Sequence, residues 1–573
     1  MDGARFRQDF RERLLKKGDV PLLRIAGLAS SGRMTELSGP MIVEQAQELA
    51  GRFALPSQRG VVLLLMPHSP ELFLLHLGLV LRGFVPAIIA WPTSRIDPQK
   101  YQRNLLHQLR NLPAEQLITL PRLARNLAGG LPYPAVGCSI ENEAAFDQLF
   151  PLSAVSDSLE ATGPVVRKRS QPEALFLQFS GGTTGAQKAV AVTAAMLYSQ
   201  LELLGTTLAV GPGDSVVSWL PLYHDMGLIA CLWFALWHGL PAVHMAANDW
   251  IVNPELLFRF SSQYKATLCW LPNFAFSYLA QQRERMAGPY DLSGVRAWIN
   301  CSEPVRLRSM NSFAAAFEYW GVQREALQSC YAMAETVFAI TQSKLGELPP
   351  AVPRGTVRPG NCASGNLAFD LVDDVFVSSG HPLCQTEVRI VNSSGSVCPE
   401  LTPGEIQVRT PSLFGGYWGQ DGFTKTSLTE DGWHATGDYG FIANRELFVI
   451  GRLKDLIIVG GQNVFPEDVE AVVNSLSAVY AGRVVAFGLD DQEYGTQALA
   501  VIAEMRQYSS EAAIELEREI RQLVVAAIGI APRYVAAVPQ RWIVKSTAGK
   551  ISRRETRERF LAERFSAVTT GVN

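Results

Sequence analysis

Apolar and polar positions alternate along the first two thirds of the chain in a repeating strand and helix pattern. The continuous apolar run Val61–Met66 predicts a buried strand. Helical apolar periodicity follows from Pro70 to Arg82 with Ser69 as its cap, and a second apolar run over residues 85–90 predicts a parallel strand. The same alternation recurs at 174–206, 215–246 and 267–282. This pattern predicts an α/β fold of wound layers.

The pattern changes twice towards the C-terminus. Residues 343–376 are rich in Pro and Gly with short apolar groups, which predicts an insertion. From 387 to 450 short alternating segments predict a small antiparallel β unit. After residues 451–455 the pattern indicates an α+β module, with an apolar helix face over 510–528 and a cap at Ser510.

Length and composition bound the organisation of the chain. At 573 residues it is too long for one hydrophobic core, so we predict a large N-terminal domain over residues 1–452 and a small C-terminal domain over residues 453–573. An apolar content of 47% with 18% charged residues is ordinary for a soluble enzyme, and a net charge of −3 gives no reason to expect nucleic-acid binding.

The cysteines and the apolar runs indicate a cytoplasmic protein. The eight cysteines are scattered without a C-x-x-C pair, which is typical of buried thiols in a reducing compartment. Charges occupy the N-terminus where a secretory signal would be apolar. The longest apolar run, residues 227–237, is too short to cross a bilayer, so we expect no stable membrane insertion.

A loop of glycines and hydroxyls over residues 179–190 directly follows the strand-like segment 174–178. Such a loop suits a polyphosphate, because glycine lets backbone N–H groups approach phosphate oxygens and Lys188 adds a positive charge. The spacing is not that of a Walker A loop. Taken alone, the same residues would also serve an ordinary turn.

Four further segments carry residues suited to nucleotide chemistry. They are Tyr331-Ala-Met-Ala-Glu335, Thr436-Gly-Asp438, Gly451-Arg-Leu-Lys-Asp-Leu-Ile-Ile458 and Gly549-Lys550. Together with the loop, and in this order, they resemble the adenylate-forming superfamily of acyl ligases and adenylation domains. The resemblance spans residues 15–560.

By this resemblance the protein would use ATP and Mg²⁺ to activate a carboxylic acid. Glu335, a hard oxygen ligand, would bind the Mg²⁺ and take part in catalysis. Tyr331 would lie against the adenine, and Asp438 would accept both ribose hydroxyls. Further nucleoside contacts would come from Ser302, Glu303, Cys330, Met333, Ala334, Ile450 and Arg452, and phosphate contacts from Thr183, Thr184, Gly185 and Lys188.

Three more residues have roles that depend on the resemblance. Lys550 would bridge the carboxylate and the α-phosphate, although its basic turn could also be a solvated charge run. Lys454 would be the hinge about which a mobile C-terminal domain swings between two half-reactions. His224 is either a core histidine beside Tyr223 or a catalytic group near the reacting carboxylate.

The string Trp219-Leu-Pro-Leu-Tyr-His-Asp-Met-Gly-Leu-Ile229 resembles fatty acyl-AMP ligases more than fatty acyl-CoA synthetases. In those ligases an insertion packs against the C-terminal domain and hinders use of CoA. The acceptor would then be the phosphopantetheine thiol of a separate acyl carrier protein, in polyketide or nonribosomal peptide assembly. An acyl pocket would draw on Trp219, Met226, Phe274 and Phe276, residue types that are also common in a plain core.

Three alternatives remain open. The string at 487–495 resembles a CoA ligase, which favours an acyl- or aryl-CoA synthetase. Asp225 lies where amino-acid-activating relatives hold an ammonium group. Gln187, Ala189 and Ala332 are bulkier or less usual than the family pattern, which is compatible with an inactive scaffolding homologue.

Overall fold

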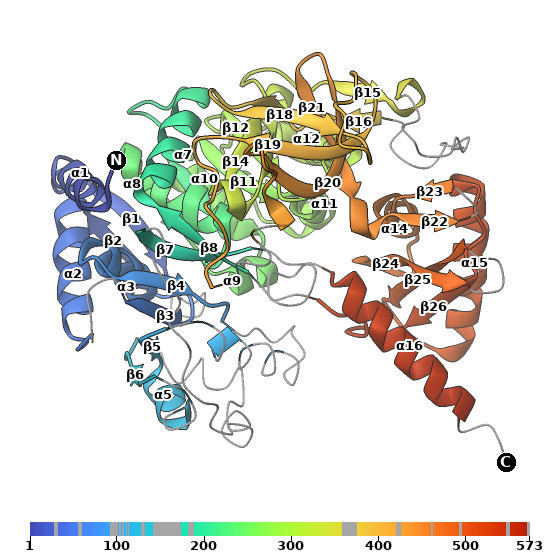
Figure 1. Cartoon of the computed structure of the whole chain (residues 1–573), viewed down its shortest axis with the longest axis horizontal. Helices are drawn as coiled ribbons and strands as arrows, with labels where there is room; N and C mark the ends of the chain where they lie inside the picture. The colour runs from blue at the N-terminus through green and yellow to red at the C-terminus, as the bar shows by residue number, and fades with distance from the viewer. Residues whose placement is uncertain are drawn as a thin grey trace.

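The computed structural model places a large N-terminal body beside a smaller C-terminal one (Figure 1). It describes residues 1–27, 33–55, 60–91, 101, 105, 108–109, 112, 114–127, 131, 133–140, 173–180, 188–357, 375–419, 424, 426–459, 462–491, 496–545 and 551–569. The α/β class and the small C-terminal α+β unit predicted from the sequence are confirmed.

The first sheet of the N-terminal body contains nine strands among the described residues, in the order β17-β14-β13-β12-β11-β9-β10-β1-β2. In chain order these are β1 (Pro21–Ala26), β2 (Met34–Ser38), β9 (Val216–Ser218), β10 (Ala242–His244), β11 (Leu268–Pro272), β12 (Ala297–Cys301), β13 (Leu327–Ala332), β14 (Ala339–Gln342) and β17 (His381–Pro382). The central strands β13, β12, β11, β9, β10 and β1 pair in parallel. At the edges, β2 pairs antiparallel with β1, and β14 pairs antiparallel with β13 and β17.

The second sheet has six described strands in the order β6-β5-β3-β4-β7-β8. They are β3 (Val61–Leu65), β4 (Val85–Ile88), β5 (Gln116–Thr119), β6 (Ala135–Gly137), β7 (Ala174–Phe179) and β8 (Ala189–Thr193). Every residue of β3 is buried, as expected for a parallel strand covered on both faces. The predicted cap is confirmed, because Ser69 Oγ accepts a hydrogen bond from the backbone N–H of Leu72 at 3.4 Å.

Helices cover both sheets and share one continuous apolar core with them. They are α1 (Gly3–Leu15), α2 (Gly39–Gly51), α3 (Pro70–Leu81), α5 (Pro121–Leu127), α7 (Ala194–Thr207), the π-helix η2 (Met226–Trp233), α8 (Phe234–His238), α9 (Ala247–Val252), α10 (Glu255–Gln263), α11 (Asn273–Gln282) and α12 (Leu307–Phe317). None of the described helices is long and apolar enough to cross a membrane.

Two small β structures follow the first sheet. The predicted insertion contributes β15 (Ala351–Pro353) and β16 (Val375–Val377), which pair antiparallel. The predicted antiparallel unit is confirmed as the four-stranded sheet β18 (Glu387–Val391), β19 (Gly404–Arg409), β20 (His434–Ala443) and β21 (Glu446–Arg452).

The C-terminal body has core clusters of its own. Its elements are β22 (Ile457–Val459), β23 (Gln462–Val464), α14 (Pro466–Val473), β24 (Val479–Asp491), β25 (Thr496–Met505), α15 (Ser510–Ile528), β26 (Tyr534–Val538) and α16 (Arg553–Thr569). The predicted cap at Ser510 was wrong by one residue. Ser509 has the extended backbone of a cap, and its Oγ accepts from Ala512 N–H at 3.1 Å, so Ser510 is already helical.

Candidate active site

Tyr331, Asp438 and Arg452 meet where the first sheet touches the small β unit. The Tyr331 hydroxyl, at the end of β13, donates to Asp438 Oδ2 at 2.6 Å. Pairing of β20 with β21 sets Asp438 opposite Arg452, and Arg452 Nε lies 3.1 Å from Asp438 Oδ1. Burial, and then the Asp438 charge, raise the pKa of Tyr331 well above its usual range, so the hydroxyl remains a donor. Tyr331, Asp438 and Arg452, all predicted to contact the nucleoside, therefore lie together.

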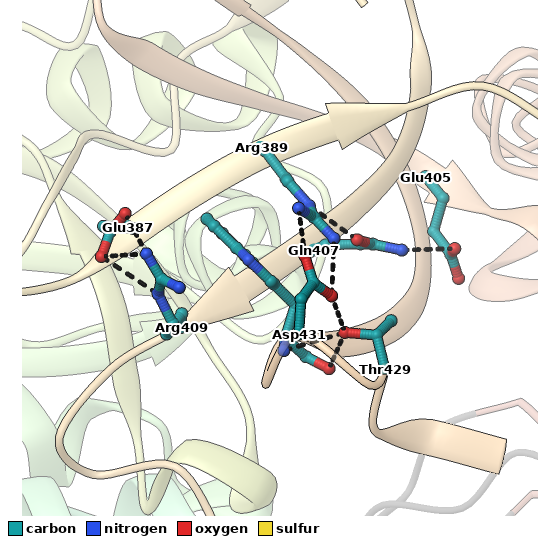
Figure 2. Close-up of polar contacts among 8 residues, drawn as sticks. Glu387, Arg389, Glu405, Gln407, Arg409, Thr429 and Asp431 are labelled. Atoms are coloured by element: carbon teal, nitrogen blue, oxygen red, sulfur yellow. Dashed lines mark hydrogen bonds and ion pairs between the residues drawn. The ribbon is translucent and has the colours of Figure 1, made fainter. Parts of the chain in front are cut away.

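The turn that carries Asp438 is held by a chain of polar contacts, and Figure 2 shows the part of it formed by Glu405, Gln407, Arg389 and Asp431. Gly437 has a φ of +69°, a conformation that favours glycine, and its N–H donates to Glu405 Oε1 at 3.2 Å. Gln407 Nε2 contacts Glu405 Oε2 at 3.5 Å, and Arg389 Nε donates to Gln407 Oε1 at 2.8 Å. Arg389 is itself paired with Asp431 at 2.8 Å. None of these supporting side chains was singled out from the sequence.

Glu335 lies in the short 3₁₀ helix Ala334–Thr336 that follows β13. Its Oε1 accepts from the Tyr417 hydroxyl at 2.7 Å, and its carbonyl accepts from Phe414 N–H at 2.8 Å. Val337, a β-branched residue, adopts a φ of +69°, and its carbonyl accepts from Gln178 Nε2 at 3.1 Å. This strained turn is thus held from both sides, which fixes where the Glu335 carboxylate points.

Lys188 lies towards the end of the glycine-rich loop and directly precedes β8. Its ammonium lies 4.6 Å from the ring centroid of Tyr417, the residue that also binds Glu335. Burial lowers the pKa of Lys188, and the Glu335 charge partly offsets this effect. The other predicted phosphate contacts, Thr183, Thr184 and Gly185, lie outside the described residues, as does Lys550.

The arrangement fits a nucleotide bound with Mg²⁺. Among the described residues no group of three or more His, Cys, Asp or Glu side chains could hold a metal ion. In proteins Mg²⁺ often binds one or two carboxylates and completes its shell with substrate phosphates and water. Glu335, with one oxygen taken by Tyr417 and Lys188 close by, suits that mode of binding.

Comparison with known proteins agrees with this geometry. The sequence matches the family described as AMP-binding enzyme over residues 35–418, which is more than half of the chain. The chain belongs to the AMP-binding enzyme family. As an AMP-binding enzyme it is an adenylate-forming ligase that uses ATP to activate a carboxylic acid.

Similar proteins include two ligases and one solved structure. "Putative ligase Rv1013" of Mycobacterium tuberculosis is 30% identical over 403 residues, covering 68% of this chain and 72% of that protein. The medium-chain-fatty-acid–[acyl-carrier-protein] ligase JamA of Moorena producens is 30% identical, covering 67% of each chain. A fatty acyl-adenylate ligase from L. pneumophila, solved with acyl adenylate and pyrophosphate, aligns with a TM-score of 0.66 at 25% identity over 97% of this chain and 96% of that one.

The remaining predicted nucleoside residues of this AMP-binding enzyme surround the same edge of the sheet. Ser302 follows β12 with a φ of +74°, and its hydroxyl lies 3.9 Å from Met226 Sδ. Glu303 Oε2 accepts from the N–H of Phe274 at 2.9 Å. Met333 is half-buried, whereas the other side chains are buried: Cys330, Ala334 and Ile450.

His224 and Asp225 directly precede the π-helix η2. His224 Nδ1 lies 3.6 Å from Asp225 Oδ1, and the same oxygen accepts from Met226 N–H at 2.8 Å. η2 is a π-helix, a rare form that is frequent at functional sites. The His224 side chain just before it is 19% exposed.

The predicted acyl-pocket residues divide between two places. Trp219 stacks on Trp250 with ring centroids 3.8 Å apart, and Phe274, 45% exposed, packs edge-on against Trp219 at 6.2 Å. Met226 is buried beside Ser302. Phe276 is fully buried and packs on Phe313 in the core. Trp250 was missed because nothing in its local sequence distinguishes it from a core residue.

Lys454, the predicted hinge, lies in the 3₁₀ helix Leu453–Asp455 that joins the two bodies. Desolvation of its ammonium, and then the Arg452 cation, lower its pKa to about 8. The neighbouring Asp455 pairs with Arg553 at 3.2 Å, and Arg553 also reaches Glu467 at 2.8 Å. The segment that enters the C-terminal body is therefore tied to the start of α16.

Asp468 of α14 forms a second link between the two bodies. Arg306, from the loop before α12, reaches its Oδ1 at 3.0 Å. Arg354, from the insertion, binds both oxygens at 2.8 and 2.9 Å. Burial raises the pKa of Asp468, but the two guanidiniums outweigh burial and hold it below its usual range. We call these three residues the Asp468 clamp.

Proposed function

We propose that this AMP-binding enzyme converts a fatty acid and ATP into acyl-AMP and pyrophosphate, and then transfers the acyl group to the phosphopantetheine thiol of an acyl carrier protein. One observation carries the first step. Strand β13 brings Tyr331 to the Asp438 pair and leads directly into Glu335, which shares Tyr417 with Lys188. Groups suited to a ribose, a metal and a polyphosphate therefore occupy one edge of the sheet.

The chemistry requires charge neutralisation more than a strong base. A carboxylate oxygen of the acid forms a bond to the α-phosphorus, and the bond to pyrophosphate breaks. Both reactants are anionic, so cations and alignment lower the barrier. Mg²⁺ bound at Glu335 would neutralise phosphate charge when present. Lys188 supplies a fixed cation, Asp438 and Arg452 hold the ribose, and Lys550 would arrive from the C-terminal domain, for which we propose residues 453–573 and a hinge at Lys454.

In the second step the negative charge develops on the departing AMP, and no charge has to develop on an enzyme side chain. The thiol loses its proton to solvent, and its sulfur attacks the acyl carbon. The bond between that carbon and the adenylate oxygen breaks, and AMP leaves with the electron pair. A fatty acid as substrate is supported by the JamA and L. pneumophila relatives, whose names specify a medium-chain fatty acid and a fatty acyl-adenylate. The aromatic group of Trp219, Trp250 and Phe274 offers apolar surface for such a chain.

The Asp468 clamp supports the carrier protein as acceptor. Arg354 belongs to the insertion, and its guanidinium is almost completely buried against a residue of the C-terminal body. A large rotation of that body would break the contact between Asp468 and its two arginine partners. The insertion therefore disfavours a rearrangement for CoA. A carrier protein presents the same phosphopantetheine thiol as CoA, so it would have to favour transfer through its own protein contacts with the enzyme.

The test separates the two steps. We expect fatty acids to support ATP–pyrophosphate exchange by the wild-type protein, and Glu335→Gln to reduce that exchange by about a hundredfold or more, since it removes a charge used in the transition state. Glu387→Gln, in an exposed ion pair of the same β unit, is the matched control and should leave the exchange unchanged.

Acceptor choice is measured with the same acid, ATP and either CoA or a holo carrier protein. Acyl-carrier product should form faster than acyl-CoA. Efficient acyl-CoA formation would identify an acyl-CoA synthetase instead. Absence of exchange with every acid tested would contradict the first step.

A further inference from the structure

Tyr417 lies between two residues of the proposed site, and no motif identified it. Its side chain is 6% exposed, and its ring packs edge-on against Phe414 with centroids 4.9 Å apart. The hydroxyl donates to Glu335 Oε1 at 2.7 Å. The ring face lies 4.6 Å from the Lys188 ammonium, within the range of a cation–π interaction.

The backbone fixes Tyr417 from both sides. Tyr417 forms an antiparallel bridge with Val190 of β8, and Trp418 N–H donates to the Ala189 carbonyl at 2.7 Å. On the other side, Phe414 N–H donates to the carbonyl of Glu335 at 2.8 Å. The segment 414–418 therefore ties the strand that follows the glycine-rich loop to the turn that carries Glu335.

The hydroxyl is a permanent donor at neutral pH. Burial, and then the Glu335 charge, raise the pKa of Tyr417 well above its usual range. A protonated phenol can hold one carboxylate oxygen while the other points to a cation. The ring meanwhile offers its negative face to Lys188, which lies in a partly desolvated position.

We propose that Tyr417 is a positioning residue for the polyphosphate. Its hydroxyl orients the Glu335 carboxylate for Mg²⁺, and its ring orients the Lys188 ammonium for the phosphates, so one side chain sets the spacing between the two. This inference rests on the proposed adenylation reaction. Tyr417 itself gains and loses no proton.

Two substitutions separate the two contacts. Tyr417→Phe keeps the ring and removes the hydroxyl. The Mg²⁺ concentration for half-maximal ATP–pyrophosphate exchange should rise about tenfold, because a hydrogen bond to a charged group is lost. Saturating Mg²⁺ should restore kcat. Tyr417→Leu removes both contacts, so the KM for ATP should rise about tenfold further even at saturating Mg²⁺.

Binding provides a readout that does not depend on turnover. The rise in Tm on adding Mg²⁺ and ATP should be reduced in Tyr417→Phe, recovered at high Mg²⁺, and reduced at every Mg²⁺ concentration in Tyr417→Leu. Tyr133→Phe is the matched control, since its buried hydroxyl donates to the carbonyl of Leu109, and neither residue belongs to the proposed site. It should resemble the wild type.

The outcomes are distinct from those of the reaction itself. If the wild type exchanges pyrophosphate but the Tyr417 variants match Tyr133→Phe in Mg²⁺ and ATP dependence, the role of Tyr417 is wrong and the reaction stands. If the wild type shows no exchange, the proposed reaction is wrong, and the Tm measurements alone test the role of Tyr417. A rise in Tm with the same Mg²⁺ dependence in all variants would overturn the inference.

Discussion

At the scale of single residues, Asp438 is the group on which the nucleoside assignment depends. Both oxygens already have protein partners, Tyr331 on one and Arg452 on the other, so the orientation of the carboxylate is fixed. A carboxylate has about four lone-pair positions, so it can still accept from ribose hydroxyls. Tyr331 and Arg452 thus orient the Asp438 carboxylate and leave it lone pairs that can accept further hydrogen bonds.

Asp438→Asn tests the ribose contact. The wild type should disfavour 2′-deoxy-ATP relative to ATP by about tenfold in kcat/KM, because a hydrogen bond to a charged group is lost. In Asp438→Asn that ratio should approach one, since the variant has already lost the charge. Steady-state pyrophosphate exchange with both nucleotides measures it. Asp291→Asn, in an exposed pair with Lys265, should keep the wild-type ratio.

Residues within motifs were predictable, and residues that join motifs were not. Tyr331, Glu335 and Asp438 each lie in a short recognisable string. Tyr417 and Trp250 have no such string, and their roles depend on contacts with residues far away in the sequence. A sequence pattern records local chemistry, whereas a contact between distant segments depends on how the strands pair.

At the scale of elements, β18 and β19 support the turn that carries Asp438 through alternating side chains on one face. Arg389 lies opposite Gln407 in the register, and Glu405 lies two residues before Gln407 on β19 (Figure 2). The sequence predicted short alternating strands here. It could not reveal their use, because the register that aligns these side chains depends on the turns between strands.

Glu405→Ala should weaken ATP binding while sparing the chemical step. Loss of the acceptor for Gly437 N–H would free a turn that needs a left-handed backbone, so the KM for ATP should rise about fivefold with kcat little changed. Glu405→Gln keeps an acceptor oxygen and should recover most of the loss. A mutant of exposed Glu387 on β18, Glu387→Ala, is the control. Equal KM values for all four proteins would contradict this role.

At the scale of the whole molecule, two bodies with separate cores share a small number of strong contacts. The hydrophobic clusters of the C-terminal body contain no residue before Ile457. Among the described residues, Phe465 adds an apolar contact between the bodies, because it stacks on Tyr439 of the small β unit with ring centroids 6.0 Å apart. The Asp468 clamp adds a directional link at α14. Because the clamp holds the pKa of Asp468 below its usual range, the contact is complete at neutral pH and is lost only as the pH falls below about 4.

Arg354→Met should loosen the C-terminal body. It removes the bidentate partner of Asp468 and leaves Arg306 as the remaining partner in the clamp. Loss of this charged hydrogen-bonded pair should cost about 2 kcal/mol, which shifts the equilibrium between the docked and undocked C-terminal body roughly thirtyfold. The hinge segment 451–455 contains Arg452 and Lys454, so trypsin should cut it severalfold faster in the variant, with little change between pH 6 and 8. Arg409→Met, which removes an exposed pair with Glu387, is the matched control.

The same variant tests the proposed preference for a carrier protein as acceptor. If the clamp restrains the rotation needed for CoA, Arg354→Met should form acyl-CoA severalfold faster while ATP–pyrophosphate exchange stays at the wild-type rate. The two measurements must change together, because both depend on release of α14. Faster hinge cleavage without any gain in acyl-CoA would mean that the clamp sets domain docking but not the choice of acceptor, and unchanged cleavage would mean that Arg306 alone suffices to hold Asp468.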